Sequence, residues 1–197
     1  MESELQEVNI TQRSVRELDH WMERYQRADP GAPATLIAAL SPMLLRFFQS
    51  QIGNRDQADD LLQDTWLRIH RVRHTYRPGE PLLPWVYAIA RRAGEDGYRK
   101  RQRISKYEIT MDQLPENPVQ SEPDNKLDGF EALIALLPPA ERETIAMLKL
   151  GGLSLEEVAR ATSSTVGAVK QRAHRAYERL RKMLIARRDT GVSGETP

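Results

Sequence analysis

Apolar residues recur at three- and four-residue spacing along most of the chain, and no stretch alternates apolar and polar residues for long enough to suggest a strand. The spacing is clearest in LIAALSPMLLRFFQSQI, in ADDLLQDTWLRIHRV and in PWVYAIARRA. Pro84 suits the first turn of the third of these helices, because its missing N–H has no intrahelical partner there. The sequence therefore predicts an all-α protein, with a loop at 75–84 before the third helix.

A proline-rich, acidic stretch divides the chain. Residues 111–126, MDQLPENPVQSEPDNK, hold three prolines and four acidic residues but little apolar content, so they offer neither regular backbone donors nor a core. We predict two small helical domains at 31–106 and 127–188, joined by a flexible linker at 107–126. The order of an N-terminal extension at 1–30 is left open, and a disordered tail is expected at 189–197.

The charge distribution distinguishes the two domains from the rest of the chain. Overall, 29 basic residues nearly balance 28 acidic ones. Residues 91–106, however, hold seven basic and two acidic residues, and residues 168–188 hold eight basic residues and one acidic residue. Each domain therefore has one basic stripe, a pattern typical of nucleic-acid binding.

The second domain has the pattern of a helix-turn-helix. Ser154 and Glu157 form a capping box that begins one helix, which we expect to end near Ala161 or Thr162. Thr165 can cap the next helix, so only a short turn separates the two.

The last helix has one apolar and one polar face. Its predicted inner face holds Val169, Ala173, Ala176, Leu180 and Leu184. The outer face of the first two turns has side chains with the donors needed to contact base edges and phosphates in a major groove. The competing interpretation is a basic face that is simply solvated. The residues expected to contact DNA are Lys170, Gln171, Arg172, His174 and Arg175.

The helix DQADDLLQDTWLRIHR, at 56–71, also has a second face. Its predicted inner stripe is Ala58, Leu62, Thr65, Ile69 and Val72, flanked by Leu61 and Trp66. The opposite face combines acidic residues with a glutamine and an apolar side chain. Such a face is often only a solvated surface, but Leu67 beside Gln63 also suits a partner protein.

Three stretches together resemble the extracytoplasmic-function (ECF) group of bacterial sigma factors: ADDLLQDTWLRIHR, PWVYAIARRAGEDGYRKRQR and LLPPAERETIAMLKLGGLSLEEVARATSSTVGAVKQRAHRAYERLRKML. The resemblance runs from about Ala34 to Leu184. It implies a promoter-specificity subunit of RNA polymerase that helps melt promoter DNA for a signal-responsive regulon. It also implies an anti-sigma factor as a partner, often membrane-anchored and wedged between the domains.

The resemblance assigns roles to particular residues. The first motif docks on the beta-prime clamp helices of core polymerase through Asp60, Gln63, Asp64 and Leu67, and the beta flap is a further expected contact. The loop at 76–83 captures a flipped base of the minus-ten element and the following helix tracks the strand, although Trp85 also fits a core anchor. The minus-ten residues implied are Tyr76, Arg77, Trp85, Arg91, Arg92, Arg99, Lys100, Arg101 and Arg103.

The chain departs from the family pattern in both DNA-binding segments. Arg92 stands where the family usually has Asn after its I-A-R run, and Gly94 and Gly97 each weaken the helix by about 1 kcal/mol relative to Ala. In the recognition helix, GAVKQR replaces the usual G-T-V-K-S-R, so Gln171 stands for Ser. Because Gln can pair with adenine, a shifted minus-thirty-five preference is expected.

Other function classes fit the sequence less well. Without cysteine, and with four scattered histidines, the chain offers no thiol nucleophile and no metal-ligand pair, so we expect no enzyme, cofactor, metal or small-molecule substrate. No signal peptide or apolar run of membrane-spanning length is evident, which favours the cytoplasm. Two alternatives remain: a free-standing helix-turn-helix regulator, and a sigma mimic that titrates an anti-sigma protein.

Overall fold

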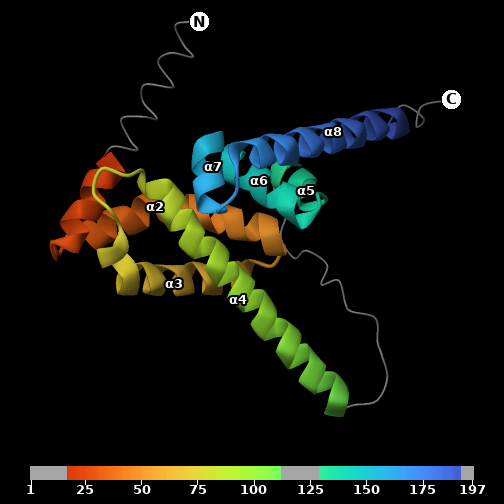
Figure 1. Ribbon diagram of the computed structural model, residues 1–197. Helices are drawn as coiled ribbons and strands as arrows, with labels where there is room; N and C mark the ends of the chain where they lie inside the picture. The colour runs from red at the N-terminus through yellow and green to blue at the C-terminus, as the bar shows by residue number, and fades with distance from the viewer. Residues whose placement is uncertain (1–16, 112–128, 192–197) are drawn as a thin grey trace, which may run out of the picture.

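The computed structural model describes residues 17–111 and 129–191, and within this part of the chain all regular structure is helical. The expected linker residues 112–126 and the tail from residue 192 lie outside the described residues. The N-terminal domain contains a helix over 17–26, α2 (Ala32–Ile52), α3 (Arg55–Val72), a short 3-10 helix η1 (Arg73–Thr75) and α4 (Leu82–Met111). The C-terminal domain contains α5 (Gly129–Ala135), α6 (Pro139–Lys149), α7 (Leu155–Ala161) and α8 (Val166–Gly191) (Figure 1).

Local sequence signals explain where several helices begin. The Asn54 side chain caps α3 by accepting a hydrogen bond from the Gln57 backbone N–H at 3.0 Å. Pro84 lies in the first turn of α4, as predicted, but the helix begins at Leu82, so the preceding loop is shorter than expected. In α3 a backbone N–H of the first turn gains a side-chain partner, and in α4 proline removes an N–H that would have none. Both features favour helix initiation.

The core of the N-terminal domain is built around α2. Its buried face holds Leu36, Leu40, Leu44, Phe47 and Phe48, which pack against α3 and α4 on one side. By length and composition alone, α2 could cross a membrane, as the core helices of many soluble proteins also could. Its buried residues instead form the centre of a helical domain.

A close approach between α3 and α4 explains one helix-weakening glycine. A Cβ atom added at Gly97 would lie 2.8 Å from Leu61 Cδ2 of α3. No side chain fits there without displacing Leu61, which is itself buried. Gly97 therefore lowers the intrinsic helix propensity of α4 but permits close packing against α3.

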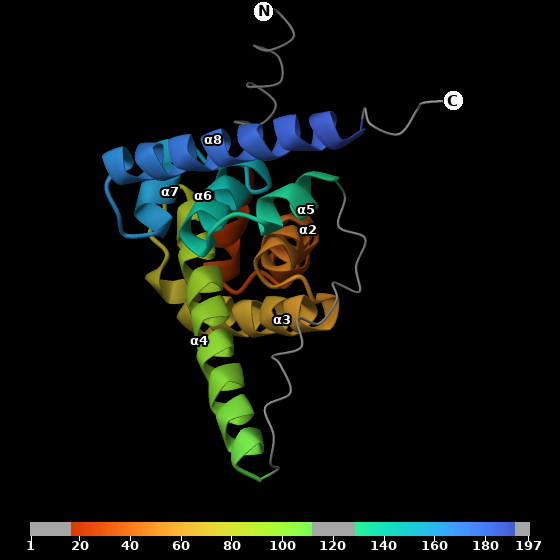
Figure 2. The same ribbon diagram turned by 90° about the vertical axis from the view of Figure 1, so that its right-hand side faces the viewer.

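The two domains pack directly against each other. Helices α5 and α6 lie on α2, and α7 lies on α4, while the C-terminal part of α4 extends away from the other helices (Figures 1 and 2). The buried apolar residues of both domains form one continuous cluster. Across the boundary Arg46 pairs with the buried Glu131 at 2.6 Å, and Arg142 donates to the Gln51 carbonyl oxygen at 3.1 Å.

Tyr87 of α4 lies at the centre of this contact. Its side chain is fully buried, stacks edge-on against Phe47 with ring centroids 5.2 Å apart, and faces Gly151 of the second domain. A Cβ atom at position 151 would lie only 2.5 Å from the Tyr87 hydroxyl oxygen. The glycine therefore allows the tyrosine to reach across the domain boundary.

The structure answers one question that the sequence left open and differs from the sequence expectations at two places. Residues 17–26 form a helix that packs on the first domain, because Leu18, Met22 and Tyr25 share one face and Met22 is fully buried. Helix α4 continues to Met111, beyond the expected domain end at 106. Leu184, predicted to face the core, is 49% exposed.

Candidate nucleic-acid and partner interfaces

The helix-turn-helix consists of α7 and α8. The Glu157 backbone N–H donates to Ser154 Oγ at 3.2 Å, and the Ser154 backbone N–H donates to Glu157 Oε2 at 2.8 Å, which completes the predicted capping box. Thr165 Oγ1 accepts from the Ala168 backbone N–H at 3.2 Å and caps α8. Four residues therefore separate the two helices, as the spacing predicted.

Four of the five residues predicted to contact DNA on α8 lie together on its outer surface. Lys170, Gln171, His174 and Arg175 are exposed and line one shallow hollow. Arg172 differs, because it is partly buried and lies near Glu143 of α6, where burial raises the pKa of the carboxyl and the charge of Arg172 slightly opposes that rise. The outer face is thus assembled largely as expected, while Arg172 turns toward the domain boundary.

Further along α8, one basic residue already has a partner. Arg179 Nε lies 3.0 Å from Glu141 Oε2, and Glu141 is only 7% exposed. The pair fastens α8 to α6. Lys182 is exposed and lies beyond this contact, so it is better placed than Arg179 for a phosphate.

The second face of α3 is exposed as predicted. Asp60 and Gln63 are exposed, Asp64 is half-buried, and Leu67 is 57% exposed. Arg68 links this face to α4, because its guanidinium contacts Asp64 at 2.9 Å and Asp96 at 2.7 Å. Arg68 therefore holds the Asp64 carboxylate in place on α3 and, through Asp96, joins α3 to α4.

An apolar hollow of about 400 Å³ lies beside Gln63 and Leu67. Ile37 of α2 is 43% exposed at its edge, and Trp66 donates from Nε1 to Ser41 Oγ at 3.0 Å beneath it. Sequence reasoning missed Ile37 because it belongs to another helix, on which it looks like one of many apolar residues. The exposed apolar surface is therefore larger than the α3 motif alone indicates.

The loop before α4 is well ordered by its own contacts. Arg77 to Glu80 form a turn in which the Glu80 backbone N–H donates to the Arg77 carbonyl oxygen at 3.1 Å. Pro78 and Gly79 occupy the central positions, and Gly79 has a φ of 87°, a conformation that glycine adopts without strain. Residues 77–80 are all exposed.

Tyr76 does not lie where a DNA contact would need it. Its side chain is 2% exposed, its hydroxyl donates to the Glu80 carbonyl oxygen at 2.6 Å, and its ring packs edge-on against Trp85 at 5.7 Å. Burial raises the pKa of its hydroxyl well above the ordinary value. Tyr76 therefore supports the loop from inside, while Trp85 is half-buried as the core-anchor interpretation expected.

The basic residues of α4 differ in their exposure and in their contacts. Arg92, Arg99, Lys100 and Arg103 are exposed, and Arg101 is partly buried. Arg91 instead lies at the domain boundary, where its guanidinium contacts Glu143 of α6 and Glu95 of its own helix, each at 2.9 Å. In this arrangement Arg91 joins the domains.

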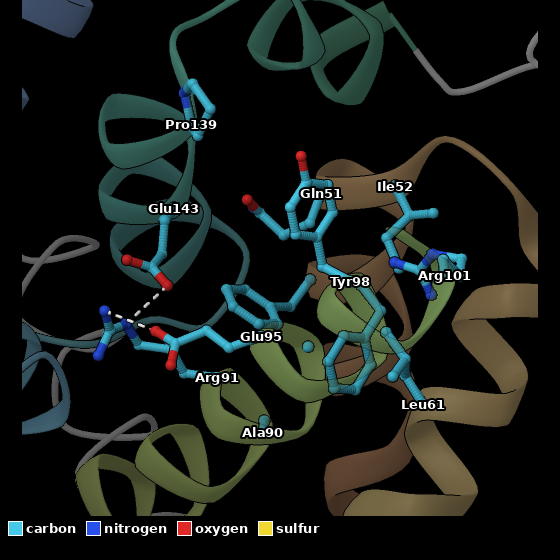
Figure 3. Close-up of a pocket in the computed structure, with 13 residues that line it drawn as sticks. Gln51, Ile52, Leu61, Ala90, Arg91, Glu95, Tyr98, Arg101, Pro139 and Glu143 are labelled. Carbon is cyan, nitrogen blue, oxygen red and sulfur yellow. Dashed lines mark hydrogen bonds and ion pairs between the residues drawn. The ribbon is translucent and has the colours of Figure 1, made fainter. Parts of the chain in front are cut away.

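A pocket of about 470 Å³ opens between α2, α3, α4 and α6, next to this ion pair (Figure 3). Phe47, Phe48 and Leu61 form its apolar floor. Arg91, Glu95 and Glu143 lie at one side in Figure 3, and burial raises the pKa of Glu143 while Arg91 opposes the rise. Among the described residues, no cluster of three metal-ligating side chains is present here or elsewhere.

A helix-turn-helix with an exposed basic surface, attached to a second helical domain with an exposed acidic and apolar face, is the architecture of a DNA-binding protein. Residues 36–104 match Sigma-70 region 2, and residues 127–180 match Sigma-70, region 4. The chain belongs to the ECF sigma factors, the promoter-specificity subunits of bacterial RNA polymerase.

Curated relatives and solved structures agree with this assignment. RNA polymerase sigma factor CarQ of Myxococcus xanthus is 34% identical over 166 residues, covering 83% of this chain and 95% of CarQ. ECF RNA polymerase sigma factor EcfG of Rhodopseudomonas palustris is 33% identical over 153 residues, covering 75% and 82%. The sigma factor RpoE of Bartonella quintana, solved with the anti-sigma factor NepR, superposes with a TM-score of 0.63 at 26% identity, covering 77% of this chain and 95% of RpoE.

Proposed function

We propose that the α3 face, with Asp60, Gln63, Asp64 and Leu67, docks on the beta-prime clamp helices of core polymerase. The observation that carries this proposal is the exposed Leu67 beside Gln63, at the edge of an apolar hollow that also includes Ile37. An apolar surface of this kind, bordered by polar groups, is typical of a protein docking site. The carboxylates would add charge complementarity with a basic partner.

Promoter DNA would then be contacted at two places. Lys170, Gln171, His174 and Arg175 on α8 would contact the minus-thirty-five element in the major groove. The loop at 77–80 and the basic face of α4 would hold the unpaired minus-ten strand, since cationic grooves suit single strands. The α4 residues proposed for this contact are Arg92, Arg99, Lys100, Arg101 and Arg103, with Arg91 joining them once the domains separate.

We further propose that an anti-sigma factor holds the chain inactive until a signal releases it. The similarity to RpoE, which was solved bound to NepR, supports this proposal. Membrane anchoring of that partner would keep the cytoplasmic sigma factor at the inner membrane. The beta flap of core polymerase would contact the second domain, and catalysis would come from polymerase alone, with no cofactor or small-molecule substrate on this chain.

Core binding can be tested with one double variant. Gln63→Ala combined with Leu67→Glu should abolish binding to core polymerase, because it removes the amide and places a charge in the apolar contact. Circular dichroism should show an unchanged helical content. Gln57→Ala with Arg71→Glu, which changes side chains at the two ends of α3, is the matched control and should bind normally. Wild-type affinity of the Gln63/Leu67 variant would rule out the clamp assignment.

A further inference from the structure

The helix over 17–26 lies outside the matched family segment, which begins at residue 36. It is nevertheless fixed firmly to the first domain through Met22, whose side chain is 1% exposed. Its polar side chains do not simply face solvent. Two of them reach the short segment from η1 to the start of α4, which is 47 to 63 residues away in sequence and contains the exposed loop at 77–80.

Gln26 holds the entrance to this loop. Its Nε2 atom donates to the Arg73 carbonyl oxygen at 2.7 Å and to the Tyr76 carbonyl oxygen at 2.8 Å, so both amide hydrogens are used. The Arg73 and Tyr76 backbones are also joined directly, because the Tyr76 N–H donates to the Arg73 carbonyl oxygen at 3.2 Å. A single side chain therefore fixes the backbone at both ends of η1.

Asp19 holds the exit of the same loop. Its Oδ1 accepts a hydrogen bond from the Leu82 backbone N–H at 2.9 Å, which is the first N–H of α4 and has no partner within the helix. Burial raises the pKa of the Asp19 carboxyl, while this hydrogen bond opposes the rise. Asp19 thus acts as an N-cap supplied from a distant part of the chain.

Between these two anchors, the loop leaves its outer surface free. Gln26 contacts backbone carbonyl oxygens, and Asp19 contacts the Leu82 backbone N–H and the inward-facing Tyr76 hydroxyl. The buried Tyr76 side chain supports the turn from inside through its bond to the Glu80 carbonyl oxygen. Arg77, Pro78 and Gly79 are exposed. Taking a base out of the stack costs a few kcal/mol. A loop that is already in its binding shape spends less binding free energy on its own ordering, so more remains to offset that cost.

We propose that Asp19 and Gln26 are positioning residues that hold the loop at 77–80 in the shape that accepts an unpaired promoter base. This inference rests on the proposed minus-ten role of the loop. It extends that role to the N-terminal helix, which touches no DNA itself. The two side chains hold the backbone of the loop in place, and the shape of that backbone sets how well the loop discriminates between bases.

The test uses full-length holoenzyme and single-stranded minus-ten oligonucleotides in which each position is varied in turn. Gln26→Met keeps the length of the side chain but removes both donors. It should lower discrimination about 5- to 30-fold at the one position that the loop accepts, and leave the preferences at the other positions unchanged. Gln49→Met, which removes an amide from α2 without touching the loop, is the matched control and should keep the wild-type profile.

A second pair of variants tests the exit of the loop. Asp19→Asn retains an oxygen that can accept from Leu82 and should keep the wild-type base profile, whereas Asp19→Leu should lose discrimination at the same position as Gln26→Met. Affinity for core polymerase and for a duplex minus-thirty-five element should stay at the wild-type level in all four variants.

Two results would overturn the proposal: unchanged discrimination in Gln26→Met and Asp19→Leu, or an equal fall in affinity at every oligonucleotide position. The second result would show that the helix contributes only general stability. Failure of the loop's minus-ten role would give a different result, because Arg77→Ala, a change in the loop itself, would then leave the base profile of the holoenzyme unchanged at every position.

Discussion

The direct packing of the two domains predicts a specific effect of Gly151→Ala. The added Cβ atom would lie 2.5 Å from the Tyr87 hydroxyl oxygen and 2.8 Å from Tyr87 Cζ, both across the domain boundary, and 2.8 Å from the Met147 carbonyl oxygen within its own domain. Tyr87 cannot easily move, because it is fully buried against Phe47. Overpacking of this kind costs about 1–3 kcal/mol.

Most of this strain is relieved if the domains separate, because two of the three close contacts are with Tyr87. A cost of about 1–3 kcal/mol changes the ratio of packed to separated molecules by a factor of about 5–150. Small-angle scattering of the free protein should therefore show a larger radius of gyration for Gly151→Ala than for wild type. Fluorescence transfer between dyes on α3 and α8 should fall correspondingly.

The control is Gly167→Ala in the same domain. A Cβ atom there has only Thr165 Oγ1 near it, at 4.0 Å, so this variant should scatter like wild type. Circular dichroism on both variants checks that the helices remain folded. A folded Gly151→Ala protein with wild-type scattering and fluorescence transfer would refute the reasoning, because the strain would then have been absorbed without opening the boundary.

Three further predictions follow from the described contacts. Tyr87→Phe should stabilise the packed arrangement by about 1–3 kcal/mol, because the buried Tyr87 hydroxyl has no hydrogen-bond partner among the described residues; thermal unfolding measures this, and a lower midpoint would contradict it. Burial raises the pKa of Glu143, although Arg91 opposes the rise, so the packed arrangement gains stability below the ordinary glutamate value of 4.5 and loses it as the pH rises through the raised pKa. Fluorescence transfer should follow this trend in wild type and lose it in Glu143→Gln. Gln171→Ala or Arg175→Ala should cost about 1–3 kcal/mol on the cognate minus-thirty-five element and relax base preference there, whereas Lys182→Ala should weaken all sequences alike and reduce the salt slope by about 0.9; identical base-preference profiles for wild type and the first two variants would contradict the assignment of α8.

Short-range signals in the sequence predicted the helix-turn-helix well. Ser154, Glu157 and Thr165 act within three residues of their partners, so their spacing alone specifies the hydrogen bonds that form. The ECF family and the all-helical fold were also predicted correctly, because three motifs occur in the expected order. The DNA-contact and polymerase-contact residues stay predictions.

What the sequence could not give depends on contacts between distant segments. The family resemblance placed Tyr76 among the minus-ten contacts, and only the packing of Trp85 and the Glu80 carbonyl oxygen around it explains its burial. Arg91 belonged to a basic stripe, yet Glu143, 52 residues later, neutralises it. The N-terminal helix has an apolar face too short to be distinguished from chance without knowing the surface on which it packs.

The interface between the domains also limits how sigma factors can be recombined. A chimera that joins this N-terminal domain to the C-terminal domain of a relative must supply a glycine opposite Tyr87 and acidic residues opposite Arg46 and Arg91. A larger residue at position 151 of the donor domain would collide with Tyr87, and a donor without those carboxylates would remove the ion-pair partner of Arg46 and leave Arg91 with only Glu95 of its own helix. Promoter specificity can therefore be exchanged between relatives most readily when both halves of this contact are exchanged together.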